Sequence, residues 1–114
     1  MSTQALFAGV VQTAVAGTGA VTICPAAGAG RSRDLVNLVI TTANAAAGTL
    51  TISDGNKTTH VLNYPNAASA PGAPLIISYD DVPLSQSGGG NAAWTITASA
   101  NASGYNVTFQ YQER

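Results

Sequence analysis

A strict two-residue alternation near the C-terminus constrains the fold more than any other feature of the sequence. Tyr105, Val107, Phe109 and Tyr111 are large and apolar, and the residues between them (106, 108 and 110) are polar and neutral. Because successive side chains of a β-strand point to opposite faces, this pattern predicts a strand with one buried face. The opposite face carries no charge.

Similar short segments recur along the chain, separated by residues typical of turns. Strand-like stretches cover 20–24, 33–43, 49–53, 57–62, 75–79 and 92–99, and no segment shows a helical period. The fold class we expect is all-β: an antiparallel two-sheet β-sandwich, jelly-roll-like, with seven or eight strands. Asp54-Gly55 predicts a tight hairpin turn in which both residues tolerate positive φ.

Two segments carry more specific expectations. In 33–43, Val36, Leu38 and Ile40 are expected on one face, and Leu35, Asn37, Val39 and Thr41 on the other. The second face is also partly apolar, which suggests that a neighbouring subunit covers it. Residues 85–91 contain three consecutive glycines and are expected to form a flexible tip.

The N-terminal segment has two interpretations. We divide the chain into residues 1–18, an N-terminal strand or docking arm, and residues 19–114, the β-sandwich domain. Phe7, Val10 and Val11 are the candidate partner-docking residues, because an extended apolar arm can add a strand to a neighbour's sheet. The alternative is an ordinary first strand of the same domain.

Charge is scarce throughout the chain. Charged residues make up 8% of the 114 residues and the net charge is −1, whereas about a quarter of a typical soluble domain is charged. We therefore expect no nucleic-acid partner. No apolar run reaches the roughly 20 residues of a membrane-spanning helix, so we expect no membrane partner. The start of the chain lacks a basic signal-peptide region, so we expect synthesis in the cytoplasm.

The reactive side chains do not form a catalytic pattern. His60 lies among threonines in a strand and is expected to be an exposed or rim residue. Cys24 is expected to be a buried thiol with no cationic neighbour that would lower its pKa. We therefore expect no enzyme activity, no cofactor and no metal. Calcium bound by Asp54, Asn56 or the Asp80-Asp81 pair is an alternative. Trp94 could stack on a sugar, but its in-phase neighbours favour core packing.

Residues 19–111 resemble small structural proteins of tailed bacteriophages. A short strand (19–24) leads into an Ala/Gly-rich turn with Arg31 and Arg33, and the long strand 33–43 follows. An Ala/Gly/Thr hairpin (44–53) and a glycine-rich loop before a closing strand pair (85–111) also fit the pattern. Among these proteins, capsid decoration or cement proteins are the most similar. The resemblance implies a jelly-roll-like virion protein that forms trimers or dimers.

The resemblance gives the function that we expect. The chain would be a non-enzymatic virion protein that binds neighbouring major capsid subunits on the capsid exterior, after synthesis in the host cytoplasm. A tail, neck or head-fibre component is the first alternative. A carbohydrate-binding module is the second, with Trp94, Tyr64 or Tyr79 as the sugar platform and Asp54 or Asp80 holding calcium.

Overall fold

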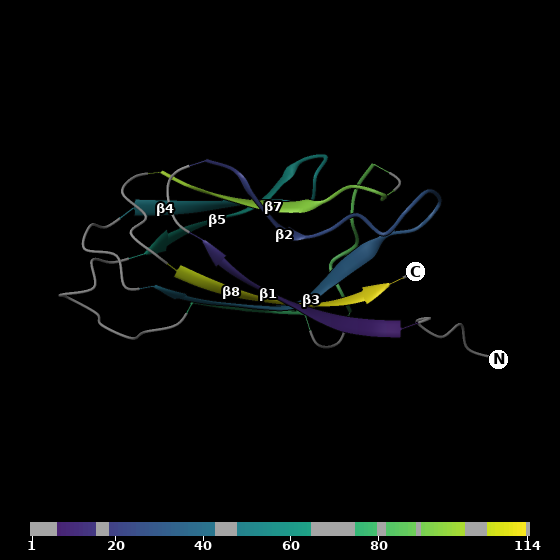
Figure 1. Ribbon diagram of the computed structural model, residues 1–114, viewed down its shortest axis with the longest axis horizontal. Helices are drawn as coiled ribbons and strands as arrows, with labels where there is room; N and C mark the ends of the chain where they lie inside the picture. The colour runs from purple at the N-terminus through teal and green to yellow at the C-terminus, as the bar shows by residue number, and fades with distance from the viewer. Residues whose placement is uncertain are drawn as a thin grey trace.

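The protein is a sandwich of two antiparallel sheets with four strands each (Figure 1). The computed structural model describes residues 7–15, 19–42, 48–64, 75–79, 82–88, 90–99 and 105–113. Within them the strands are β1 (Phe7–Val15), β2 (Val21–Cys24), β3 (Arg33–Thr42), β4 (Gly48–Ser53), β5 (Thr58–Tyr64), β6 (Leu75–Ser78), β7 (Trp94–Ala98) and β8 (Tyr105–Glu113). These described residues form no helix, so none of them contributes a helix that could span a membrane. The predicted fold class is confirmed.

The strand order is that of a jelly roll. One sheet has the order β1-β8-β3-β6 and the other β2-β7-β4-β5. The pairs β1·β8, β2·β7, β3·β6 and β4·β5 are those of a chain folded in half about the β4–β5 turn. The four pairs make a two-stranded antiparallel ribbon. Two further pairs, β8 with β3 and β7 with β4, close this ribbon into the two sheets. Eight strands wound in this way define the jelly roll.

The core lies between the two sheets and follows the alternation of the sequence. In β8 the buried apolar residues are Tyr105, Val107, Phe109 and Tyr111, as predicted. In β7 they are Trp94, Ile96 and Ala98, also as predicted. Trp94 and Phe109 come from opposite sheets, and their ring centroids lie 5.1 Å apart. Contact between large rings across the two layers joins the sheets into one core.

The predicted face assignment of 33–43 is wrong at its start. Leu35 is fully buried together with Leu38 and Ile40, whereas Val36 is only half-buried. The register of β3 against β8 shifts between Leu35 and Asn37. Leu35 pairs with Tyr111 and Asn37 with Gln110, so Val36 is an extra residue without a partner of its own in β8. Such a β-bulge adds one residue and reverses the alternation before it. Leu35 thereby joins the core.

The β4–β5 turn is also less tight than predicted. Ser53 pairs with Thr58, so four residues (54–57) make the connection. Gly55 has a φ of 96°, whereas Asp54 does not have a positive φ. The Asp54 side chain is instead buried and organises the turn by accepting hydrogen bonds from the backbone N–H groups of Asn56 and Lys57. A side chain that mimics a backbone turn replaces the expected two-residue hairpin.

Candidate functional site

His60 does not belong to a catalytic constellation among the described residues. It is half-buried in β5; its Nε2 lies 2.9 Å from Tyr79 Oη and its Nδ1 2.9 Å from Thr59 Oγ1. Both neighbours are hydroxyls, and burial lowers the pKa of His60. The described residues gather no group of three His, Cys, Asp or Glu side chains that could hold a metal ion. The His60–Tyr79 contact ties the border of one sheet to that of the other.

Cys24 is a core thiol, as the sequence predicts. Its side chain is fully buried, and its Sγ lies 3.8 Å from the carbonyl oxygen of Pro25. Burial raises the pKa of Cys24 to about 11. The expectation that no cationic neighbour acts on this thiol is wrong, because Arg33 contacts it and partly opposes the effect of burial. Because the thiolate is the nucleophile, a thiol that stays protonated near neutral pH is inert.

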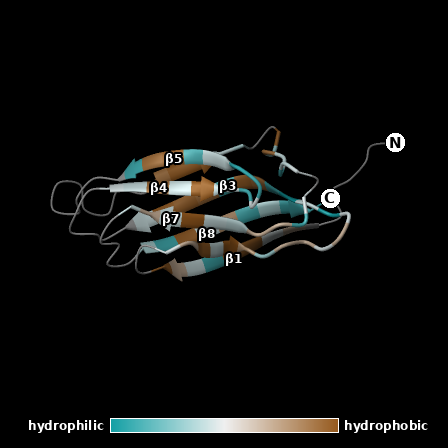
Figure 2. Cartoon of the chain, turned by 90° about the horizontal axis from the view of Figure 1, so that it is seen from above, coloured by the Kyte–Doolittle hydropathy of each residue, from teal (hydrophilic) through white to brown (hydrophobic). Residues whose placement is uncertain are grey.

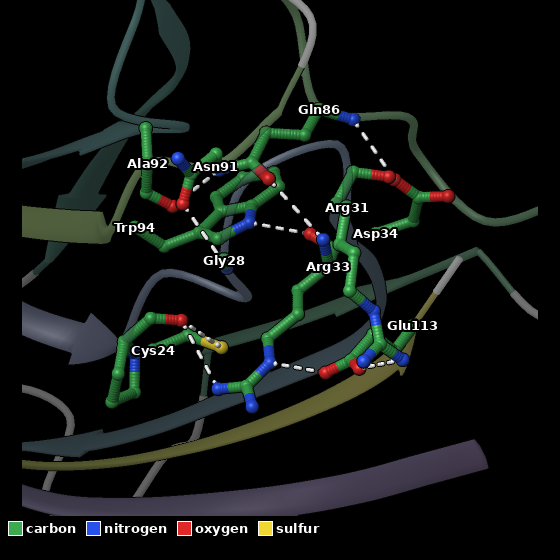
Figure 3. A network of polar contacts seen from close by, with 12 residues as sticks. Cys24, Gly28, Arg31, Arg33, Asp34, Gln86, Asn91, Ala92, Trp94 and Glu113 are labelled. Atoms are coloured by element: carbon green, nitrogen blue, oxygen red, sulfur yellow. Dashed lines mark hydrogen bonds and ion pairs between the residues drawn. The ribbon is translucent and has the colours of Figure 1, made fainter. Parts of the chain in front are cut away.

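The residues considered for sugar binding take structural positions where the structure describes them. Trp94 is fully buried, and its Nε1 donates a hydrogen bond of 2.7 Å to the Arg33 carbonyl oxygen (Figure 3). Tyr79 is half-buried and contacts His60. The side chain of Tyr64, and all of Asp80 and Asp81, lie outside the described residues. A buried ring cannot stack on a sugar, so Trp94 packs in the core as expected.

Residues 85–88 do not form a free tip, because Gln86 is 6% exposed and bridges the two sheets. Its backbone N–H donates to Asp34 Oδ1 at 3.1 Å (Figure 3), and its side-chain oxygen accepts the N–H of Arg33. Its side-chain nitrogen donates to the carbonyl oxygens of Asp54 and Ala92. The predicted flexible tip is therefore wrong for this part; Gly89 lies outside the described residues. A single neutral residue in a loop gives no sequence signal for such a bridge.

Asp54 forms the second half of this bridge. Its side chain is fully buried, and its Oδ2 accepts hydrogen bonds from Ser87 N at 2.8 Å and Ser87 Oγ at 2.6 Å. Its Oδ1 accepts from the backbone N–H groups of Asn56 and Lys57. Burial alone would raise the pKa of Asp54, but the hydrogen bonds from Ser87, Asn56 and Lys57 outweigh burial and lower it. Groups of the protein itself donate hydrogen bonds to both carboxylate oxygens, and these bonds hold the β4–β5 turn against the loop at Ser87.

An ion cluster of Arg31, Arg33 and Glu113 lies beside this bridge (Figure 3). Glu113 is 1% exposed, and its carboxylate forms ion pairs with Arg31 and with Arg33 Nε, the latter at 2.8 Å. The Arg33 guanidinium also lies 4.6 Å from the centroid of the Tyr111 ring. Ion pairs with a buried carboxylate offset part of the cost of removing its charge from water. The cluster fixes the end of β8 against the start of β3.

All charged side chains of the described residues lie at this end of the sandwich. They belong to the ion cluster, to the Gln86 bridge, or to the β4–β5 turn next to it: Arg31, Arg33, Asp34, Asp54, Lys57 and Glu113. The β4–β5 turn joins this end because Asn56 Nδ2 donates to the Ser87 carbonyl oxygen. Over the described strands the outward sides of both sheets consequently expose no charge, because Asp34, which is in register with Gln112 of β8, is buried beneath Ser32 and Gln86.

We call the outward side of the β1-β8-β3-β6 sheet the β8 face. Its cross-strand rows are Ala8–Gln112–Asp34, Val10–Gln110–Asn37–Ser78, Gln12–Thr108–Val39–Ile76 and Ala14–Asn106–Thr41, and Asp34 is buried. The amide of Asn37 donates to Gln110 Oε1 at 2.9 Å, and Val10 and Ile76 are 57% and 63% exposed. A hollow of about 390 Å³ lies over β1 and β8 and is lined by Gln12, Thr13, Ala14, Asn106, Val107 and Thr108. This face combines exposed apolar groups with neutral hydrogen-bonding groups.

The outward side of the β2-β7-β4-β5 sheet, which we call the β7 face, has a different composition. Figure 2 shows pale and brown residues alternating along β4 and β7. The outward residues are mostly hydroxyls: Thr95, Thr97, Thr49, Thr51 and Ser53. Val61 of β5, opposite Thr51, is 61% exposed. Threonine-rich strands suit a solvated surface as well as a contact, so the β8 face is the stronger candidate for docking.

The three residues proposed for docking lie in β1, which pairs with β8 over all nine of its residues. Val10 points outward, whereas Val11 is half-buried and packs against the core. Of Phe7 only the backbone is described, and residues 1–6 and 16–18 lie outside the described part. In the isolated chain, residues 7–15 are thus an edge strand of the sandwich. A docking role for them stays a prediction.

Comparison of the chain with protein-family models, with curated proteins and with solved structures finds no match. A function must therefore be argued from the geometry of the described residues.

Proposed function

We propose that the chain is a non-enzymatic structural protein of a tailed-phage virion, located on the capsid exterior, where it decorates and stabilises the shell by binding neighbouring major capsid subunits. The observation that carries the proposal is the β8 face, a four-stranded surface on which the described residues expose no charged side chain and on which Val10 and Ile76 are exposed. Its one charged residue, Asp34, is 3% exposed. Exposed apolar groups set among neutral polar groups are typical of protein contact surfaces.

The physical advantage of such a surface is repetition. Each copy needs only a modest affinity, because a shell offers many equivalent sites and contacts to more than one subunit add by avidity. Uncharged contacts also depend little on ionic strength, whereas ion pairs between exposed charges weaken as salt rises. The chain would therefore stay bound to particles over a wide range of salt concentration.

The experiment mixes the purified chain with shells assembled from the major capsid protein of the same phage and measures co-sedimentation. Thr108→Lys and Thr97→Lys form a matched pair. Both threonines are half-buried, point outward and lie in the second strand of their sheet, Thr108 on the β8 face and Thr97 on the β7 face. Burying an unpaired ammonium group in a contact is costly.

We expect the wild-type chain to bind the shells at low and high salt. Thr108→Lys should weaken binding about tenfold or more, and Thr97→Lys should leave it unchanged. A chain that does not bind the shells would refute the proposal. Loss of binding in Thr97→Lys alone would refute the assignment of the β8 face.

A further inference from the structure

One sheet edge lacks the protection that the other edges have. β1 and β5 form opposite borders of the sandwich (Figure 2), and within the described residues each pairs with a strand on one side only. The edge strands β2 and β6 have only four residues each, and β2 is bulged against its neighbour. β5 has a register shift beside it, and its His60 contacts Tyr79. Short length, bulges and covering contacts are the usual devices that keep sheet edges from associating.

Within the described part of the chain β1 is neither short nor bulged, and only β2 of the other sheet lies beside it. It is nine residues long, contains no charge and no proline, and keeps an unbroken register with β8 from Phe7↔Glu113 to Val15↔Tyr105. An unbroken strand of this length extends over about 30 Å. It presents a row of backbone N–H and C=O groups that a further strand can pair with.

We propose that this edge binds a second copy of the chain: β1 pairs antiparallel with β1 of the other copy about a two-fold axis at Val11, and the two sheets become one eight-stranded sheet. The inference does not depend on the capsid role. Centring on Val11 gives the full overlap of Phe7–Val15 with itself. Antiparallel pairing over this length forms about eight to ten backbone hydrogen bonds, similar to a typical protein interface.

The side chains of β1 suit pairing with themselves. In this register Val10 lies opposite Gln12 of the second copy, and Ala8 opposite Ala14, all exposed on the β8 face. Like charges directly opposite each other destabilise a sheet, and β1 brings none together. Ala8 and Ala14 are small, so two copies approach without a clash. A two-fold contact of identical surfaces is also closed, so it produces a dimer rather than a fibre.

The test uses the full chain and measures its mass by sedimentation over a range of protein concentrations. The variant Val10→Lys/Gln12→Lys places lysine opposite lysine across the axis, and Val10→Lys/Gln12→Glu places lysine opposite glutamate. Both positions are exposed, so the fold should tolerate the changes, and the fluorescence of the buried Trp94 checks this for each variant. Val61→Lys on β5 is the matched control, because Val61 is as exposed as Val10 and also lies on an edge strand.

We expect the wild-type chain to sediment at twice its mass of 11.4 kDa. The lysine–lysine variant should dimerise about tenfold more weakly or worse, the lysine–glutamate variant within about threefold of wild type, and Val61→Lys like wild type. A monomeric wild-type chain, or a lysine–lysine variant that dimerises normally, would overturn the proposal. A third result would also overturn the proposal: the wild-type chain is a monomer that binds shells, and the lysine–lysine variant does not bind them. In that case β1 would pair with a strand of the capsid protein.

Cross-linking tests the register directly. Residues directly opposite in an antiparallel pair have Cα atoms about 4.5–5.5 Å apart, within the range of a disulfide. An oxidised mixture of the single variants Val10→Cys and Gln12→Cys should form a covalent dimer, and each variant alone should not. Cys24 is buried and common to all samples. Equal cross-linking of Val10→Cys alone would refute the axis at Val11. A dimer that does not bind shells would refute only the capsid role.

Discussion

Replacing Asp54 by asparagine tests whether the buried carboxylate holds the β4–β5 turn and the Gln86 loop together. The aspartate accepts four hydrogen bonds, two on each oxygen, and all four donors belong to Asn56, Lys57 and Ser87. Asparagine has nearly the same shape, but one of its two oxygens is replaced by an NH₂ group. If the remaining oxygen still accepts the hydrogen bonds from Asn56 and Lys57, the NH₂ group faces the Ser87 N–H. Both groups are donors, so no hydrogen bond forms between them.

The magnitude follows from these contacts. The Ser87 hydroxyl can rotate and accept from the new NH₂ group, but the Ser87 N–H is left without an acceptor, which costs about 1–3 kcal/mol. The two remaining bonds lose their ionic character, and each weakens by up to about 1 kcal/mol. We therefore expect Asp54→Asn to lower the free energy of unfolding by about 2–4 kcal/mol, or the melting temperature by roughly 10 °C.

The pH dependence gives the sharper test. The pKa of Asp54 is lowered in the folded state from an ordinary value of 3.8, so the ionised form stabilises the fold above pH 3.8. That stabilisation is lost as the pH falls through the folded pKa. Urea unfolding of both proteins should therefore show a large difference at neutral pH that shrinks as the pH falls below 3.8. Equal stability at neutral pH, or a difference independent of pH, would refute the role assigned to Asp54. Ser87→Ala, which removes only the hydroxyl donor, should cost about 1 kcal/mol.

Three further predictions concern other parts of the sandwich. Because burial raises the pKa of Cys24 to about 11, a thiol reagent at neutral pH should modify it only as fast as the protein unfolds; rapid labelling of the native chain would contradict this. Gly9→Ala would place a Cβ 2.8 Å from Cε2 of the Tyr111 ring, and we expect a loss of about 1–3 kcal/mol in urea unfolding, where unchanged stability would argue against the contact. Burial lowers the pKa of His60 from 6.5, so the stabilisation from its neutral form is present above pH 6.5 and lost as the pH falls through the folded pKa. His60→Gln should then flatten the melting temperature between about pH 7 and pH 5, and an unchanged profile would contradict the assignment.

The period-two pattern predicted the strands well, because a strand with one buried face has alternating apolar and polar residues in its own sequence. β7 and β8 have the predicted core residues throughout. The pattern failed for Leu35 and Val36, where the register against β8 shifts by one residue. A bulge depends on how two strands meet, and β8 lies some seventy residues further along the chain. The sequence of β3 alone therefore does not reveal it.

The polar end of the sandwich was beyond sequence reasoning for a related reason. Sequence patterns assign Asp54 to a turn or to a calcium site, and they assign no role to Glu113. The structure gives each of them protein partners that are distant in sequence: Ser87 for Asp54, and Arg31 and Arg33 for Glu113. Long-range polar contacts follow no sequence period, so neither pattern nor composition predicts which donor meets which acceptor.

The sequence by itself determined the all-β class, most of the core residues and the scarcity of charge, because alternation and composition are local properties. Only the tertiary structure decided where the few charges lie and which strands form the borders. Rolling the ribbon into a jelly roll collects the described charges at one end and leaves no exposed charge on the β8 face. It also places β1, an uninterrupted uncharged strand, at an edge. Strand order results from pairing between distant segments, and the surfaces available to other proteins result from strand order.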